Sequence, residues 1–128
     1  MKRSQVFKCA DSKMVVEVLT GDDCCENIEC CGKAMQEMTA NTVDASKEKH
    51  VPVASASNGG IKVKVGEVEH PMTDAHYIEW IEVVNGQYVN RKYLNPNEAP
   101  EAEFFVPMSS GLKLRIYCNL HGLWEKQL

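Results

Sequence analysis

The stretch between residues 61 and 118 contains several short segments with the pattern of β-strands, separated by turn residues. In residues 61–65, apolar side chains alternate with lysines, as expected for a strand with one buried face. Further strands are expected at residues 77–84, 87–94, 101–108 and 112–118. The first two of these are joined by Asn85-Gly86, a typical hairpin turn. This regular succession predicts an all-β fold, built as an antiparallel sandwich or barrel.

The first forty residues have a different character. Two short strand-like runs, residues 5–9 and 14–19, precede a segment rich in turn residues and cysteines that ends at residue 32. This region has too few apolar residues to bury a core unaided, and domains this small usually rely on metals or disulfides. Residues 32–41 are expected to form a linker or a helical turn. We therefore expect a small β domain over residues 1–38 and a β-sandwich domain over residues 39–128.

Composition and charge exclude several classes of protein. The chain has 128 residues, of which 44% are hydrophobic and 25% are charged, as in globular proteins. No apolar run approaches the ~18 residues of a membrane-spanning helix, and the N-terminus shows no secretory signal. A cytoplasmic location is therefore the default expectation, with no membrane partner. The net charge of −4, without a cluster of lysines and arginines, argues against a nucleic-acid partner.

The cysteines and histidines are unevenly distributed. Five of the six cysteines lie between residues 9 and 31, whereas all four histidines lie between residues 50 and 121. In a reducing compartment, clustered cysteines indicate metal ligands more readily than disulfides. The histidines all fall at expected strand ends or turns, where a β-sandwich can gather residues that are distant in sequence.

Cys118 and His121 lie close enough in sequence to bind one metal from a single turn. Side chains alternate between the two faces of a strand, and Cys118 falls on the same face as the apolar residues of segment 112–118. Its thiol is therefore expected on the buried side of the strand's end. Taken singly, such a cysteine is more often a core residue, and each histidine is equally compatible with an exposed loop. Together, four imidazoles and a thiolate suit iron or copper better than magnesium or calcium. The residues alone therefore predict a transition-metal site formed by His50, His70, His76, His121 and Cys118.

Three stretches carry a more specific signal: residues 41–53 around His50, residues 62–80 with His70-Pro71-Met72 and His76-Tyr77, and Cys118-Asn119-Leu120-His121-Gly122. Together they resemble the desulfoferrodoxin, or superoxide reductase, family over residues 41 to 128. The resemblance implies an immunoglobulin-like antiparallel β-sandwich preceded by a small desulforedoxin-like β domain. It also implies an enzyme that reduces superoxide to hydrogen peroxide at one iron, with four equatorial histidines, an axial Cys118 thiolate and a sixth position for substrate.

The same resemblance gives roles to the two residues that precede His50. Lys49 is implied to attract the superoxide anion, which an acidic protein would otherwise repel. Glu48 is implied to occupy the sixth position of the iron in the oxidised resting state. Without the resemblance, both residues would be interpreted as part of a solvated charged loop. The family pattern further implies a homodimer and an electron donor such as rubredoxin or a similar small carrier.

The family pattern is incomplete in the N-terminal domain. Class I members hold a second iron there through a Cys-x-x-Cys pair and a vicinal cysteine pair. Cys9 matches the first position and Cys30-Cys31 match the vicinal pair, but Ser12 stands where the second cysteine is expected. A serine hydroxyl does not normally ionise near neutral pH, so it is a poor ligand for a soft metal. Three states remain open: a metal-free domain, an iron or zinc site completed by Cys24 or Cys25, and a redox disulfide.

Two other function classes remain open for the whole chain. One is a copper or iron electron-transfer protein without catalytic activity, because blue-copper carriers are also β-sandwiches with cysteine and histidine ligands near the last strand. However, no methionine follows His121, and four histidines exceed the needs of a blue-copper site. The other is a non-catalytic interaction module whose N-terminal cysteines bind a structural zinc ion, which leaves the four histidines unexplained. The sequence thus favours an oxidoreductase that detoxifies superoxide in oxidative-stress defence.

Overall fold

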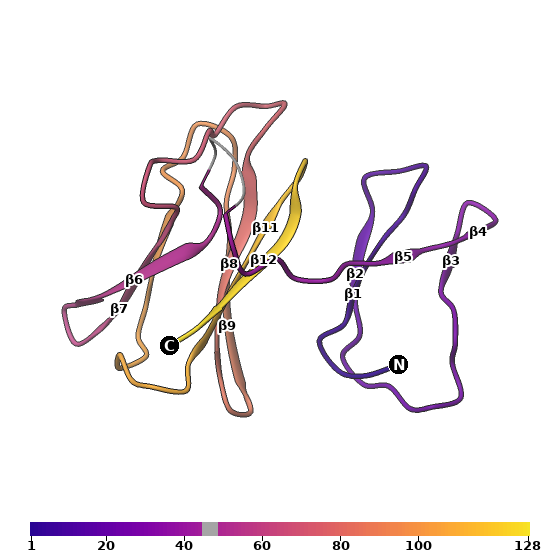
Figure 1. Cartoon of the computed structure of the whole chain (residues 1–128), viewed down its shortest axis with the longest axis horizontal. Helices are drawn as coiled ribbons and strands as arrows, with labels where there is room; N and C mark the ends of the chain where they lie inside the picture. Colours follow the sequence, from indigo (N-terminus) through magenta and orange to yellow (C-terminus); the bar gives the residue numbers. More distant parts are fainter. Residues whose placement is uncertain (45–48) are drawn as a thin grey trace. The chain divides into compact units, whose positions relative to one another are not determined.

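The computed structural model describes residues 1–44 and 49–128, and its regular elements in these ranges are all β-strands (Figure 1). The chain divides into two compact units, Met1–Thr39 and Ala40–Leu128. This boundary lies one residue beyond the one expected from the sequence. Within the described ranges, no helix is long and apolar enough to cross a membrane.

The N-terminal unit contains a three-stranded antiparallel sheet and a separate hairpin. The sheet has the order β2-β1-β5, with β1 at Val6–Lys8, β2 at Val15–Glu17 and β5 at Gln36–Glu37; the hairpin pairs β3 (Glu29–Cys30) with β4 (Lys33–Ala34). Phe7, Cys9, Val18 and Met35 form its small core. The expectation of a linker or helical turn after residue 32 is wrong for β4 and β5, because their backbones pair with β3 and β1.

The C-terminal unit packs a three-stranded sheet of order β10-β7-β6 against a four-stranded sheet of order β12-β11-β8-β9 (Figure 1). The strands are β6 (Pro52–Ser57), β7 (Gly60–Val65), β8 (Ile78–Asn85), β9 (Tyr88–Tyr93), β10 (Glu101–Phe104), β11 (Lys113–Cys118) and β12 (Gly122–Gln127). All their pairings are antiparallel, so the predicted antiparallel all-β fold is confirmed. The sequence interpretation did not identify β6 and β12.

The core between the two sheets follows the expected alternation. On β7, Ile61, Val63 and Val65 are buried while Lys64 is exposed. On β11, Leu114 and Ile116 face the same core, and Cys118 is the last residue of that row. Because side chains alternate along a strand, the Cys118 thiol lies on the core side at the end of β11, with its residue fully buried.

The opposite face of the four-stranded sheet carries a buried ionic group. Glu82 on β8 is paired across the strands with Arg115 on β11 and Arg91 on β9. Arg115 Nη1 lies 3.0 Å from Glu82 Oε1, and Arg91 Nε donates a hydrogen bond of 2.7 Å to Glu82 Oε2. A buried carboxylate is tolerated when such charged donors surround it. These three side chains link β8, β9 and β11, the last of which carries Cys118.

Candidate metal centre

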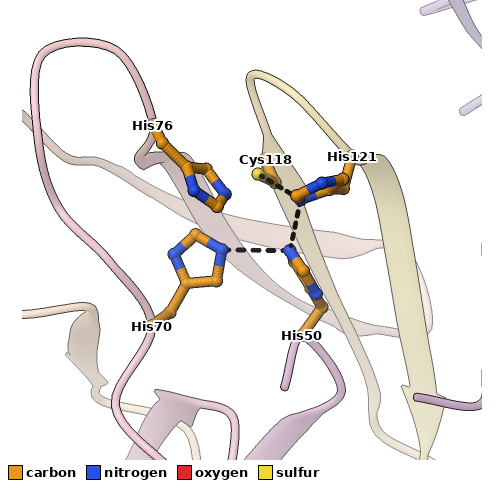
Figure 2. Close-up of side chains that lie close together, drawn as sticks. All are labelled: His50, His70, His76, Cys118 and His121. Atoms are coloured by element: carbon orange, nitrogen blue, oxygen red, sulfur yellow. Dashed lines mark hydrogen bonds between the residues drawn. The ribbon is translucent and has the colours of Figure 1, made fainter. Parts of the chain in front are cut away.

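Four separate segments bring the five predicted ligands together in the C-terminal unit (Figure 2). His50 lies just before β6, His70 and His76 lie in the connection between β7 and β8, Cys118 ends β11, and His121 lies in the turn before β12. One potential ligand atom from each residue lies within 4.8 Å of those from all the others. The cluster expected from the sequence is therefore present as a spatial group.

The four imidazole rings form a nearly regular square. Successive ring centroids, from His50 through His70, His76 and His121 and back to His50, are 4.6, 4.6, 4.9 and 4.8 Å apart. The diagonal from His50 to His76 is 6.4 Å, slightly less than the side multiplied by the square root of two. The planes of neighbouring rings are inclined at 68–81° to each other, and the four rings surround one common space.

The donor atoms have spacings that suit a single ion. His50 Nε2 lies 3.0 Å from His70 Nε2 and 3.0 Å from His121 Nδ1. Two imidazole nitrogens bound at right angles to one transition metal at roughly 2.1 Å are about 3.0 Å apart. Cys118 Sγ lies 3.7 Å from His121 Nδ1 and supplies a fifth donor, a soft one. This nitrogen and sulfur set fits iron, and five donors leave one position of a six-coordinate ion for another molecule.

Burial differs strongly among the five residues. His50 and His70 are each 2% exposed and Cys118 is fully buried, whereas His76 is half-buried and His121 is exposed. The thiol therefore approaches the centre of the square from the protein interior. Among the described residues, His76 and His121 are therefore the members of the cluster nearest to solvent.

Three hydrogen bonds that involve the backbone position the buried histidines. His70 Nδ1 lies 2.6 Å from the carbonyl oxygen of Pro71, which can only accept a hydrogen bond, so Nδ1 carries the proton and Nε2 presents a lone pair to the cluster. Asp44 Oδ1 accepts hydrogen bonds from the backbone N–H groups of His50 (2.7 Å) and Val51 (3.1 Å). The sequence analysis did not identify Asp44, because an isolated aspartate six residues before a ligand carries no recognisable signal.

Of the two residues assigned roles beside His50, Glu48 lies outside the described residues. Lys49 is half-buried, and its backbone packs against Gly66. Gly66 has a φ of 78°, and a Cβ at this position would collide with the carbonyl oxygens of Lys49 and Val68. Only glycine both adopts this positive φ readily and lacks the Cβ that would collide, so Gly66 allows the close backbone packing that holds Lys49 in place.

A second group of possible ligands lies in the N-terminal unit and consists of Cys9, Cys30 and Cys31, whose sulfur atoms lie within 4.8 Å of one another. Cys31 and Gly32 form the two-residue turn between β3 and β4, with φ values of 54° and 72°. Such left-handed pairs are typical of tight hairpins. The turn places Cys31 Sγ 3.7 Å from Cys30 Sγ.

Ser12 occupies the fourth corner of this group. Its Oγ lies 4.0 Å from Cys30 Sγ and accepts a hydrogen bond of 3.2 Å from the backbone of Met14. Hydrogen bonds from Cys30 and then Ser12 lower the pKa of Cys9 to about 7, while the bond to Cys9 raises the pKa of Cys30 to about 11. Of these two thiols, Cys9 therefore ionises more readily than Cys30.

Cys24 and Cys25 are exposed and are not part of this three-thiol group. The structure thus gives no support to a site completed by either of them. None of the six cysteines, all of which lie in the described ranges, forms a disulfide.

Comparisons with known proteins agree with this geometry. The family model of desulfoferrodoxin matches residues 42–127. A desulfoferrodoxin homologue of Methanothermobacter thermautotrophicus is 49% identical, covering 94% of this chain and 96% of its own, and a superoxide reductase of Pyrococcus horikoshii is 38% identical, covering 73% and 97%. The crystal structure of the superoxide reductase from Treponema pallidum superposes with a TM-score of 0.75 at 28% identity, over 96% of this chain and 97% of the other. The chain therefore belongs to the desulfoferrodoxin family.

Proposed function

We propose that the protein is a superoxide reductase, which reduces superoxide with one electron and two protons to hydrogen peroxide. The observation that carries this proposal is the square of four imidazoles with the Cys118 thiol at its buried side. The superoxide reductases among its relatives and structural neighbours support the same activity. His50, His70, His76, His121 and Cys118 are the proposed ligands of one iron.

Iron that cycles between its ferrous and ferric states would supply the electron when bound in this cluster. The residues set the conditions for that chemistry. Cys118 would hold the iron from the interior with a negative, polarisable sulfur, and such a donor favours the loss of an electron from a bound metal. The four imidazoles are neutral donors, so they add no negative charge to that of the thiolate and do not increase the repulsion of an anionic substrate. The greater exposure of His76 and His121 supports the approach of substrate from their side of the cluster.

We propose that Lys49 attracts superoxide to this side of the cluster. Superoxide is an anion and the chain has a net charge of −4, so a cation next to the site raises the local concentration of substrate. The position of Lys49 directly before His50, on a backbone fixed by Gly66, supports this role. Glu48, by its position two residues before His50, is proposed as the group that takes the sixth position in the oxidised resting state.

For the N-terminal unit we propose a desulforedoxin-like domain over residues 1–38 with an incomplete metal site. Three thiols suit zinc or iron, but Ser12 at the fourth corner is a weaker ligand than a cysteine, so we expect weak metal binding there. We further propose that the protein is a cytoplasmic homodimer reduced by rubredoxin or a similar carrier. The grouping of Cys9, Cys30 and Cys31 supports this location, because clustered cysteines in a reducing compartment bind metals more readily than they form disulfides.

The test is stoichiometric. Ferrous protein with a measured iron content is mixed with a known amount of superoxide, and hydrogen peroxide and dioxygen are quantified. A reductase gives one peroxide for each superoxide consumed and evolves no dioxygen. A dismutase gives one peroxide and one dioxygen for every two superoxide anions, and that result would overturn the proposal. An electron carrier without catalytic activity would react no faster with superoxide than free ferrous iron does.

A further inference from the structure

His76 is less buried than His50, His70 and Cys118, the buried members of the cluster. It lies in a turn between β7 and β8 and is half-buried as a residue, whereas His50 and His70 are almost fully buried. Within the turn, the backbones of Thr73 and His76 exchange two hydrogen bonds, of 2.9 and 3.1 Å. These bonds shape the turn but do not connect it to the strand that carries Cys118.

Asn119 makes that connection, through both its backbone and its side chain. Its backbone N–H donates to the carbonyl oxygen of Tyr77 at 3.2 Å. Its side-chain Oδ1 accepts from the backbone N–H of Tyr77 at 2.9 Å, and its Nδ2 donates to the carbonyl oxygen of Ala75 at 2.9 Å. The three bonds thus hold the residue before His76 and the residue after it.

From this geometry we infer that Asn119 is a positioning residue for the metal centre. It follows Cys118 directly in the chain, so its amide couples the backbone of the thiolate ligand to the backbone of the His76 ligand across more than forty residues of sequence. The inference rests on the proposed iron site, and it adds a residue that contacts neither the ion nor the substrate. Groups that orient the ligands of a metal commonly change its affinity 10–100-fold when removed.

The chemistry of the amide explains why asparagine is suited to this position. The turn offers one backbone donor, at Tyr77, and one backbone acceptor, at Ala75, on either side of His76. A primary amide matches both at once. An ionised aspartate keeps the acceptor for Tyr77 but places a second acceptor against the carbonyl of Ala75, and an alanine provides neither group.

The test measures iron binding by the full-length protein. Asn119→Ala and Asn119→Asp are compared with the native protein by competition for ferrous iron against a chelator, and by the absorption and paramagnetic resonance spectra of the ferric form. We expect Asn119→Ala to release iron at least about tenfold faster, with an altered ferric spectrum, and Asn119→Asp to fall between it and the native protein. Leu120→Ala is the matched control, because this neighbouring side chain in the same turn is 58% exposed; it should behave as the native protein does.

Equal iron release and identical spectra for the native protein and Asn119→Ala would overturn the inference. So would a change in thermal stability of the metal-free protein with no change in the ferric spectrum, because that is the signature of a purely structural residue. If Asn119→Ala does not fold, Asn119→Asp decides alone, and native values for it would overturn the inference. Superoxide is not used in this experiment, so a protein that binds iron through this arrangement yet fails to reduce superoxide would refute the proposed function and leave the role of Asn119 intact.

Discussion

The indole ring of Trp124 stacks on the imidazole of His50, with ring centroids 4.7 Å apart and planes inclined by only 12°. Trp124 lies on β12, is 8% exposed, and forms an isolated parallel bridge with Asn41. Through this bridge, the backbone of Asn41 bonds to the residues on either side of Trp124. The orientation of the His50 ring is therefore fixed by an aromatic side chain more than seventy residues away in sequence.

Replacing Trp124 should loosen the metal centre in proportion to the lost stacking. Trp124→Phe keeps an aromatic face against His50 and should retain iron nearly as the native protein does. Trp124→Ala removes the ring, frees His50 to rotate, and should release iron several-fold faster to a chelator, while costing about 3–5 kcal/mol in the free energy of unfolding. Trp80→Phe is the control, because Trp80 stacks on Tyr117 and not on a ligand; faster iron release in this variant would mean that global stability, and not the stack, controls the site.

Cys118 should be responsible for the colour of the oxidised protein. A ferric ion bound to a thiolate absorbs visible light through charge transfer from sulfur, and a serine oxygen does not give a band at the same energy. Cys118→Ser should therefore lose this band while the four histidines still retain some iron. The measurement is an absorption spectrum of the ferric protein at known iron content. A band that persists unchanged would show that Cys118 is not a ligand.

The local pattern of the sequence was sufficient to predict most strands of the sandwich. Segments such as 61–65 and 112–118 alternate in a two-residue period, and the Asn85-Gly86 signal led to the expected hairpin. Its two-residue turn lies one position later than expected, at Gly86 and Gln87, because Asn85 still pairs with Tyr88; Gly86 has a φ of 58°. β6 was missed because Ser and Ala dominate it, and its exposed and buried residues do not differ in polarity. β4 and β5 were missed because strands of two residues carry no period at all.

For the metal centre, sequence reasoning identified all the residues that the structure brings together but not those that orient them. His and Cys are rare and chemically distinctive, so their clustering is visible in the chain itself. Asn119, Asp44 and Trp124 act through backbone bonds and stacking, which depend on the folded arrangement. Similarly, the two-residue alternation of β11 puts Arg115 on the face opposite the core, yet it is only 4% exposed, because Glu82 and the Trp80 ring contact it.

Removing the charge of Lys49 should slow the capture of superoxide and weaken its dependence on ionic strength. A cation that steers an anion acts during approach, and salt screens that attraction. Lys49→Ala should therefore react more slowly at low salt and converge with the native protein at high salt, with unchanged iron content. The measurement is the second-order rate constant of ferrous protein with superoxide at several salt concentrations. Identical salt dependence in both proteins would remove Lys49 from the mechanism.

Gly66→Ala offers a second way to disturb Lys49 without changing charge. The new Cβ would collide with the carbonyl oxygen of Lys49, so the backbone must shift. We expect slower capture of superoxide with the slope against ionic strength largely preserved, because the lysine remains but is displaced. A Gly66→Ala protein with native kinetics would show that the position of this backbone is unimportant.

Ser12→Cys should convert the N-terminal unit into a strong metal site. Two thiolates bound tetrahedrally to one ion at roughly 2.3 Å are about 3.8 Å apart. The Sγ atoms of Cys30 and Cys31 are already 3.7 Å apart, and Ser12 Oγ lies 4.0 Å from Cys30 Sγ. A sulfur at position 12 would therefore complete the tetrahedron with little movement. After reconstitution with iron, the iron content measured by elemental analysis should rise from one to two ions per chain.

Cobalt provides a direct measure of the same change, because the intensity of its sulfur charge-transfer bands increases with the number of bound thiolates. In titrations, Ser12→Cys should bind a second cobalt ion far more tightly than the native protein does. Ser12→Ala, which removes the hydroxyl, should show whether Ser12 contributes to the residual binding of the three thiols. If Ser12→Cys gains neither a second iron nor a tighter cobalt site, then position 12 is not at the fourth corner, and the N-terminal cysteines serve a purpose other than holding a metal.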